Sequence, residues 1–158
     1  MLTRKTKLLL SLTAAVPLMF AACTDNGIFN PLDDAAGTYQ ITVYKGALVP
    51  HTYTVQPGDP VWSASMPNGG HYTIDDGTLV LRSDGSFTET NNYTVTPSGG
   101  SSAPSYFVSQ GSWNVSGTQL QLYSAAEGRN VTGVLDFDTI NYQELDEDGV
   151  LQSYEYQR

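Results

Sequence analysis

The chain has 158 residues, of which seven are basic and sixteen are acidic, and its formal net charge is −9. This length suits a single domain, and an aromatic content of 11% argues against an intrinsically disordered chain. All sixteen acidic residues follow Cys23, so residues 23–158 carry a formal charge of −12. Such a surface repels phosphate groups, which excludes nucleic-acid binding and argues against electrostatic attraction to anionic lipid headgroups.

The first 22 residues have the sequence of regions that is typical of a secretory signal peptide. Three basic residues lie within segment 1–7, and the apolar segment 8–22 follows directly. The apolar segment contains Pro17 and is too short for a comfortable membrane-spanning helix. The sequence therefore predicts export, with residues 1–22 removed as a signal peptide.

The end of this region, Phe20-Ala21-Ala22-Cys23, resembles the lipobox of bacterial lipoprotein signals. The resemblance implies cleavage before Cys23 and lipidation of its sulfur with acyl chains such as palmitate. Two or more chains anchor a protein stably, at about 0.8 kcal/mol for each buried methylene. The alternative is an ordinary secretory signal that is cleaved after Ala22. Thr24, rather than Asp, follows Cys23, and the same resemblance then favours lipid anchoring at the outer membrane of the cell envelope.

Beyond Cys23 the sequence predicts a short tether followed by strands. Residues 23–36 are small and polar, as in a lipid-anchored tether. Over residues 37–158, short runs rich in Thr, Val and Tyr alternate with Gly, Asp-Gly and Ser-Gly pairs, which indicates antiparallel strands joined by tight turns. We expect strands at residues 38–44, 51–56, 72–74, 78–82, 87–95, 106–115, 119–123, 131–135, 139–144 and 150–157.

The connections between these runs are of two kinds. Segments 57–70 and 97–104 are rich in Pro, Gly and Ser, and we expect long surface loops there. Pairs such as Asp76-Gly77 tolerate positive φ angles, and this pair is expected to form a turn between two separate strands. No stretch of ten residues after Cys23 has helical periodicity.

A series of short strands at roughly 8–12-residue spacing is typical of an antiparallel up-and-down meander that closes into a barrel or folds into a sandwich. The residues that carry a resemblance to the lipocalin-like domains of bacterial lipoproteins are Gly37-Thr38-Tyr39, Gly77-Thr78-Leu79, Asp84-Gly85-Ser86-Phe87, Gly111-Ser112-Trp113 and Tyr154-x-Tyr156-x-Arg158. The resemblance implies an all-β, lipocalin-like barrel of about eight to ten strands over residues 37–158.

Four aromatic residues are candidates for lining a ligand pocket: Tyr39, Phe87, Phe107 and Trp113. Phe107 and Trp113 share one face of the strand expected at 106–115, because side chains alternate between the two faces of a strand. An eight-stranded barrel either fills its interior with side chains or holds one small ligand. A filled core and the floor of an apolar pocket are therefore both open interpretations of these aromatic residues.

Glu89 and Asn91 share a strand face with Phe87 and Tyr93. A buried, unpaired carboxylate is costly, so this pattern needs an explanation if the face points inward. The two polar side chains then lie past the rim of the barrel, or a bulge turns them outward, or the interior contains water.

No group of residues indicates catalysis. His51 and His71 are the only histidines, and no paired base and nucleophile accompany them, so we expect exposed loop residues. The segment Asp136-x-Asp138 resembles part of a calcium loop, but Ile140 and Asn141 replace the oxygen ligand and the glycine that such a loop needs. We expect a hairpin turn at this segment. For the protein as a whole we expect no catalytic residue, no metal site and no cofactor.

These observations together predict a membrane-anchored, non-enzymatic binding module for a small, largely apolar ligand. The alternative is a structural or protein-interaction lipoprotein of the cell envelope that uses loops such as 57–70 and 97–104. An enzyme would require a cleft in which His51, His71 and carboxylates converge.

Overall fold

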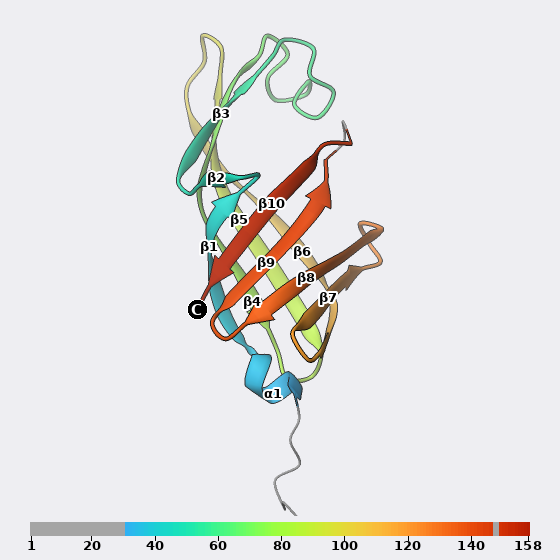
Figure 1. The fold of residues 1–158 in the computed structure, drawn as a ribbon. Helices are drawn as coiled ribbons and strands as arrows, with labels where there is room; N and C mark the ends of the chain where they lie inside the picture. The colour runs from blue at the N-terminus through green and yellow to red at the C-terminus, as the bar shows by residue number, and fades with distance from the viewer. Residues whose placement is uncertain (1–30, 147–148) are drawn as a thin grey trace, which may run out of the picture.

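A computed structural model of the chain describes residues 31–146 and 149–158, which form one antiparallel sheet preceded by a short helix (Figure 1). The elements are α1 (Pro31–Ala35), β1 (Gly37–Tyr44), β2 (Ala47–Leu48), β3 (His51–Val55), β4 (Gly70–Leu81), β5 (Ser86–Pro97), β6 (Ala103–Ser116), β7 (Gln119–Ser124), β8 (Arg129–Asp136), β9 (Thr139–Leu145) and β10 (Leu151–Gln157). The signal peptide predicted at residues 1–22, and Cys23, lie outside the described residues.

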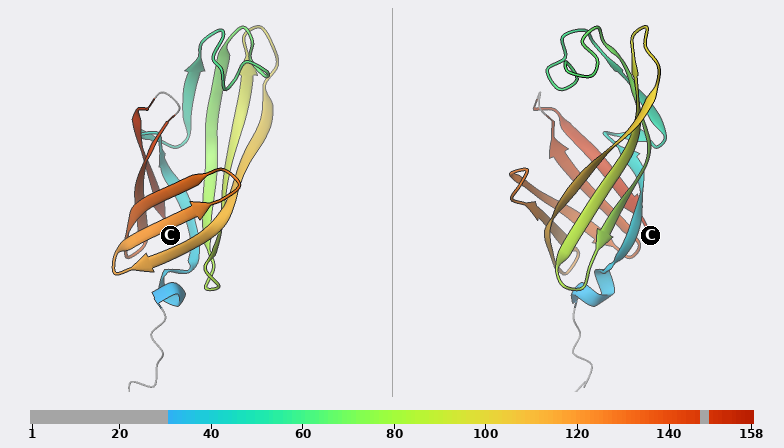
Figure 2. Two further views of the ribbon diagram at one scale, coloured as in Figure 1. Left: turned by 90° about the vertical axis from the view of Figure 1, so that its right-hand side faces the viewer. Right: turned by 180° about the vertical axis from the view of Figure 1, so that it is seen from behind.

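The sheet closes on itself through β1. This strand pairs with β10 along one edge, and its residues 37–40 pair with residues 78–81 of β4 along the other. Seen from behind, β1 lies beside β4 (Figure 2). Eight strands, β1 and β4 to β10, thus form a closed antiparallel barrel, and β2 and β3 are added at its side. This confirms the predicted all-β up-and-down barrel and excludes the sandwich.

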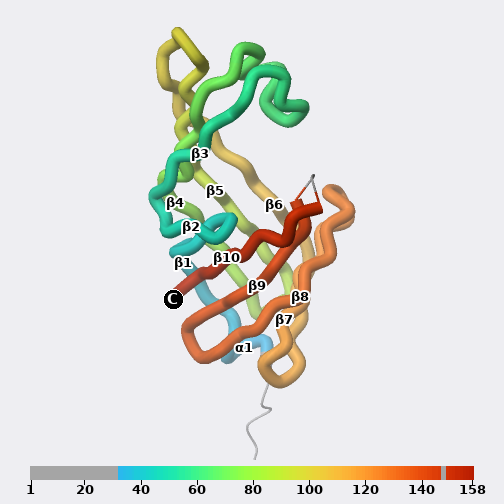
Figure 3. The backbone as a smooth tube through the Cα atoms, turned by 45° about the horizontal axis from the view of Figure 1, so that its top comes forward, coloured from blue at the N-terminus to red at the C-terminus, as the bar shows by residue number. Residues whose placement is uncertain are grey.

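Strands β4, β5 and β6 are longer than the others and continue past the end of the barrel (Figures 2 and 3). Beyond the barrel, β3 pairs with residues 70–74 of β4, and residues 103–111 of β6 pair with β5. We call β3 and these outer halves of β4, β5 and β6 the extension. We call the end of the molecule that carries the extension the loop end, and the opposite end, which carries α1, the helix end.

The turn predicted at Asp76-Gly77 is wrong, because β4 runs without interruption over Gly70–Leu81. The register with β5 shifts between Ile74 and Asp76, as in a β-bulge. Gly77 is buried beside it, and a Cβ there would lie 2.3 Å from Oδ1 of Asn91. Glycine within a strand often marks a bulge or a close backbone approach, and an Asp-Gly pair is also common in turns. The sequence pair alone therefore did not distinguish a bulge from a turn.

Helix α1 lies within the segment that we predicted as a tether. Ala35 is buried, and its carbonyl oxygen accepts hydrogen bonds from the Tyr39 hydroxyl at 2.8 Å and from Nη2 of Arg158 at 3.1 Å. Residues 31–35 therefore belong to the folded domain. No helix among residues 31–146 and 149–158 has the length and apolar character needed to cross a membrane.

Two apolar cores fill different parts of the molecule. The main core occupies the barrel and contains Ala35, Tyr39, Ile41, Leu79, Leu81, Phe87, Trp113, Val115, Leu120, Leu122, Val131, Ile140, Tyr142 and Tyr156. A smaller core at the loop end consists of Val55, Met66, Tyr72 and Ile74. Along the inward face of β5, Phe87 belongs to the main core and Tyr93 packs against the smaller one. Glu89 and Asn91 lie between them on the same strand face.

Candidate functional site

A cavity of about 200 Å³ lies at the loop end, between the extension and residues 56–69, which we call the cover segment. The lining residues are Tyr44, Val61, Trp62, Tyr72, Ile74, Asn91, Tyr93 and Phe107. Five of these eight side chains are aromatic. A cavity of about 150 Å³ accommodates benzene in other proteins, so this one has room for a single ring with a short substituent.

Most lining residues come from the inward face of the extension. Tyr72 and Ile74 lie two positions apart on β4 and share one face of the strand, and Ile74 pairs with Tyr93 of β5. On the next ladder Asn91 pairs with Phe107 of β6. Side chains two apart on one strand point to the same side, so the ladders bring these residues together on one face.

The cover segment supplies the opposite wall and is fixed to the extension. Met66 is fully buried, and its backbone N–H donates to the carbonyl oxygen of Trp62 at 2.7 Å. Oδ1 of Asp59 accepts from the backbone N–H of Val61 at 3.0 Å. Gly70 has a φ of 155°, and a Cβ there would lie 2.4 Å from a backbone oxygen of β5. The segment predicted as a loop is therefore anchored by a buried side chain and by a close backbone contact.

The aromatic rings of the site pack against one another. Trp62 stacks on Tyr72 with ring centroids 4.6 Å apart, and Tyr72 stacks on Tyr53 at 5.0 Å. Trp62 also meets Tyr93 edge to face at 5.8 Å. Ring pairs in these geometries are favourable beyond the area they bury. These ring contacts hold the aromatic side chains of the wall in place.

Two tyrosines of this wall, Tyr44 and Tyr72, have raised pKa values. Burial, followed by the negative charge of Glu89, raises the pKa of Tyr44 to about 12. Burial also raises the pKa of Tyr72 well above its usual range. Both therefore keep their protons at neutral pH, and neither hydroxyl brings a negative charge to the wall.

The lining also includes the amide side chain of Asn91, which is 6% exposed. Its Nδ2 donates to Oε1 of Glu89 at 3.4 Å. Its Oδ1 has no hydrogen-bond partner among the described residues. This oxygen is buried and lies against Gly77 of β4, and leaving it without a partner costs free energy.

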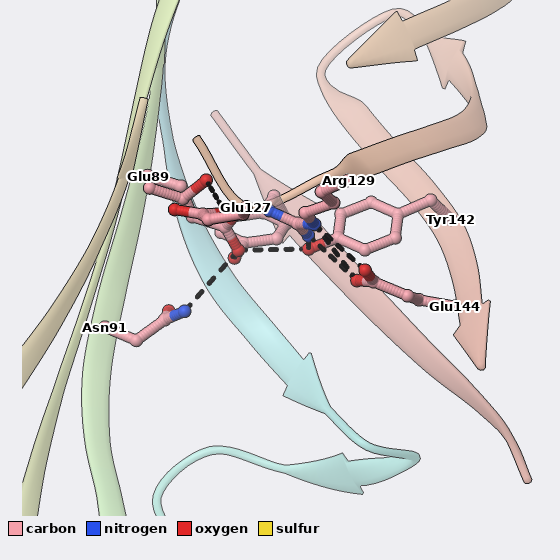
Figure 4. Close-up of polar contacts among 8 residues, drawn as sticks. Glu89, Asn91, Glu127, Arg129, Tyr142 and Glu144 are labelled. Carbon is pink, nitrogen blue, oxygen red and sulfur yellow. Dashed lines mark hydrogen bonds and ion pairs between the residues drawn. The ribbon is translucent and has the colours of Figure 1, made fainter. Parts of the chain in front are cut away.

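Behind Asn91 lies a buried polar cluster, which Figure 4 shows in part. Glu89 is 2% exposed and forms an ion pair with Arg129. Its Oε1 accepts from the hydroxyls of Tyr156 at 2.5 Å and of Tyr142 at 3.0 Å. Nε of Arg129 donates to Glu144 at 3.1 Å. We call these five residues and Asn91 the polar cluster.

Charge and burial together set the protonation of this cluster. Burial alone would lower the pKa of Arg129, but the adjacent Glu89 carboxylate outweighs it and raises the pKa above its usual range. Burial raises the pKa values of Tyr142 and Tyr156 well above their usual range. Arg129 is therefore a permanent cation, and both tyrosines remain hydrogen-bond donors.

The cluster answers the question that Glu89 and Asn91 posed in the sequence. Both side chains face inward, and the ion pair with Arg129 compensates the charge of the buried Glu89 carboxylate. This arrangement differs from all three that the sequence led us to expect. The sequence contained one clue to the partner of Glu89, namely the small number of basic residues. Only four basic residues follow Cys23, and an inward-facing carboxylate requires one of them.

The four candidate pocket residues are not brought together. Tyr39, Phe87 and Trp113 are packed in the main core, and Nε1 of Trp113 donates to the carbonyl oxygen of Arg82 at 2.9 Å. Phe107 alone of the four lines the cavity. Sequence reasoning missed Trp62 because it lies in a segment read as a loop, although a Trp between prolines and glycines is itself a signal of a packed side chain.

The two histidines lie outside the lining of the cavity. His51 and His71 are exposed, as expected, but they occupy β3 and β4 rather than loops. The segment 136–138 forms the hairpin turn between β8 and β9, with Phe137 at a φ of 50°. Within residues 31–146 and 149–158, no three His, Cys, Asp or Glu side chains are grouped so that they could hold a metal ion.

Comparisons with protein-family models, with curated proteins and with solved structures found no match to this chain. The barrel is consistent with a lipocalin-like fold in its closed, eight-stranded, antiparallel form. Fold alone does not determine function, so the functional argument depends on the geometry of the cavity and the polar cluster.

Proposed function

We propose that this protein is a lipid-anchored, lipocalin-like and non-enzymatic binding protein of the cell envelope that holds one small, largely apolar ligand. The observation that supports this most is the cavity of about 200 Å³ with five aromatic lining residues. Concave, mostly apolar sites with few polar groups are typical of small-molecule binding. The location of this site outside the closed part of the barrel gives a ligand access from the loop end.

Access to the cavity is expected at its exposed lining residues. Val61 of the cover segment is 55% exposed, and Phe107 on β6 is 47% exposed. Tyr72 and Ile74, in contrast, are buried. The cavity therefore has a rim of accessible apolar side chains and a buried inner end.

Calorimetric titration of the purified full-length protein with a neutral, single-ring ligand such as ethylbenzene tests this function, because a ligand of this size fits a cavity of about 200 Å³. We expect Phe107→Ala to weaken ethylbenzene binding about tenfold, because it removes part of the apolar rim. Tyr106→Ala is the matched control, since Tyr106 is exposed on the neighbouring position of β6 and does not line the cavity. No saturable ethylbenzene binding to the wild-type protein would contradict the proposed function.

The proposal of a lipid anchor rests on the sequence of segment 20–23. Helix α1 and the cover segment lie at opposite ends of the molecule (Figure 1). A lipid on Cys23 would then hold the helix end toward the membrane and leave the cavity facing away from it.

Metabolic labelling with a palmitate analogue tests the anchor. Cys23→Ser is expected to abolish labelling and to leave an uncleaved precursor, whereas Thr24→Ser is expected to keep both labelling and processing. Unchanged labelling of Cys23→Ser would exclude lipidation at this residue.

A protein-interaction role is the second candidate, and β6 supports it. Residues 103–111 pair with β5 on one side, whereas pairing with β7 begins only at Ser112. Tyr106 on this segment is 69% exposed. An unpaired strand edge with exposed apolar side chains can accept a further strand. Cross-linking in intact envelopes, compared between wild type and Tyr106→Ser, would detect a partner on this edge.

A further inference from the structure

The outer half of β6 has a free edge at the border of the extension (Figure 2). Residues 103–111 pair with β5, whereas the pairing with β7 begins only at Ser112. The Ser109 hydroxyl donates to Glu127 at 2.6 Å, which places the turn between β7 and β8 beside that residue. We call residues 103–108, which precede this contact, the β6 edge. In the described part of the chain β5 is its only strand partner, so its outward backbone groups can pair with another strand.

The β6 edge carries exposed apolar side chains and no charge. Tyr106 is 69% exposed, Phe107 is 47% exposed and Val108 is 38% exposed. Phe107 faces inward and lines the cavity, so Tyr106 and Val108 point to the outer face of the sheet. Exposed edge strands usually carry charged residues, above all lysine, that prevent pairing with another chain. This edge has none of them and is therefore open to pairing.

The distribution of charge along the chain indicates what kind of strand fits this edge. Residues 90–126 contain no Asp, Glu, Lys or Arg, although residues 23–158 carry a formal charge of −12. A basic or acidic partner would therefore find no complementary charge on the β6 edge or on the loop that precedes it. A second copy of this chain, in contrast, presents the same uncharged strand, so no like charges meet where the two strands touch. The charge pattern thus favours a second copy over a charged partner.

The order of side chains on the β6 edge is complementary to itself. In an antiparallel pair about a two-fold axis at Tyr106, this residue lies opposite Tyr106 of the second copy, and Pro104 lies opposite Val108. All three positions share the outer face, so the cross-strand contacts on that face are apolar throughout. Pro104 has no N–H and limits the ladder at one end. The pairing then covers residues 104–108 and ends before the contact between Ser109 and Glu127.

We infer that the β6 edge binds a second copy of this chain, with residues 104–108 of the two copies paired antiparallel about a two-fold axis. Such a contact uses the same surface on both copies and closes at a dimer. The other free edge of the sheet is β3, and joining β3 of one copy to β6 of the next would repeat without closing. The inference goes beyond the proposed ligand site and does not depend on it.

Disulfide cross-linking in intact envelopes tests this geometry on the full-length chain. Directly opposite residues of an antiparallel pair have Cα atoms about 4.5–5.5 Å apart, which is within the range that a disulfide bridges. Tyr106→Cys is therefore expected to form a disulfide-linked dimer when the envelopes are oxidised with copper phenanthroline. The product is detected as a band of twice the mass on a non-reducing gel.

Tyr123→Cys is the matched control for cross-linking. Tyr123 is 51% exposed, but it lies on β7, where β6 and β8 occupy both edges of the strand. We expect no dimer band from this variant, and the wild type, whose one cysteine is Cys23, gives the background. Equal dimer bands from Tyr106→Cys and Tyr123→Cys would overturn the inference. A product of Tyr106→Cys with another mass would show that a different protein occupies this edge, which also overturns the second copy.

Tyr106→Lys tests the association without any cross-link. Two lysines would lie directly opposite each other at the two-fold axis, and like charges at such positions destabilise a strand pair. Sedimentation velocity of the purified full-length protein is expected to show a dimer for the wild type. The variant should raise the dissociation constant of that dimer at least about tenfold. Because Tyr106 is 69% exposed, this substitution is expected to leave the fold intact.

Gln121→Lys is the control, since it makes the same change in net charge at an exposed position of β7. It should leave the dimer as in the wild type, because both neighbours of Gln121 in the sheet belong to its own chain. A wild-type protein that stays monomeric at all concentrations, or that forms a series of larger oligomers, would overturn the two-fold dimer. Ethylbenzene binding reports on the ligand site separately, so either proposal can fail while the other stands.

Discussion

Glu89 and Arg129 form an ion pair inside the barrel, between the main core and the loop-end core. Buried ion pairs rarely stabilise a protein more than apolar residues would, because both charges lose their hydration. Here the pair also orients its neighbours. Tyr142 and Tyr156 donate to Glu89, and Asn91 does the same, so the carboxylate links β5 with β8, β9 and β10. The pair thus holds Asn91 at the inner end of the cavity.

Glu89→Gln is expected to lower the free energy of unfolding by about 3 kcal/mol, because it leaves Arg129 buried with only one carboxylate partner. The glutamine can still accept hydrogen bonds, so the loss measures the charge rather than the shape. Chemical denaturation with urea provides the measurement.

Glu127→Gln is the matched control for this change. Glu127 is exposed and accepts a hydrogen bond from the Ser109 hydroxyl at 2.6 Å, which a glutamine oxygen can also accept. We expect a change within ~0.5 kcal/mol. Equal effects of the two substitutions would show that the buried ion pair has no special role in stability.

The inward direction of Glu89 follows from strand alternation with Phe87, and sequence alone indicates it. The identity of its partner does not follow. Arg129 is distant in the sequence, and it begins β8, two residues before the strand expected at 131–135. Contacts across a barrel interior depend on strand tilt and stagger, and a single sequence contains no direct measure of either.

At the scale of elements, the period-2 patterns of the sequence predict the strands of the barrel closely. The structure differs from the prediction locally, in strand β4 and in the cover segment. The strands expected at 72–74 and 78–82 form the single strand β4, since a bulge replaces the expected turn. The cover segment has neither helical nor strand periodicity. Its order comes from side-chain anchors and local hydrogen bonds, which short-range patterns do not reveal.

Met66→Ala tests whether that anchor holds the cover segment in place. Met66 is fully buried between the segment and Gly70 of β4. Large-to-small changes at such sites cost about 2–5 kcal/mol, and this loss should fall on the local closure of the segment. We expect faster cleavage within residues 56–69 by a nonspecific protease, together with weaker ethylbenzene binding.

Ala64→Ser is the control within the same segment, because Ala64 is exposed. It should leave protease cleavage and ethylbenzene binding as in the wild type. A Met66→Ala variant with wild-type protease resistance would show that the segment is held by other contacts.

At the scale of the whole molecule, the helix end and the loop end are built differently. Near the helix end, α1 and the guanidinium of Arg158 pack against the main core, and Nη2 of Arg158 donates to the Tyr39 hydroxyl at 2.6 Å. The loop end consists of the open extension, the cover segment and the cavity. The larger core therefore lies in the barrel, and the proposed ligand site lies outside the closed part of the barrel.

Alkaline pH offers a test of how far the whole interior behaves as one unit, because tyrosines occur in both cores. Burial is the largest cause that raises the pKa values of Tyr39, Tyr44, Tyr53, Tyr72, Tyr142, Tyr154 and Tyr156. In an unfolded chain tyrosines titrate near pH ~10. Above that pH the folded state binds more protons than the unfolded state does, so stability falls as pH rises.

The stabilisation linked to these tyrosines is complete below pH ~10 and is lost as pH rises toward and beyond the value of about 12 for Tyr44. Net stabilities of domains are only about 5–15 kcal/mol, so several such groups suffice to unfold the barrel. We therefore expect tyrosinate absorbance from the interior to appear together with the loss of β-sheet circular dichroism. The chain unfolded in guanidinium, as the control, should titrate near pH ~10 in one non-cooperative step. Gradual ionisation of all tyrosines near that pH, with an unchanged β-sheet signal, would mean that water reaches both cores.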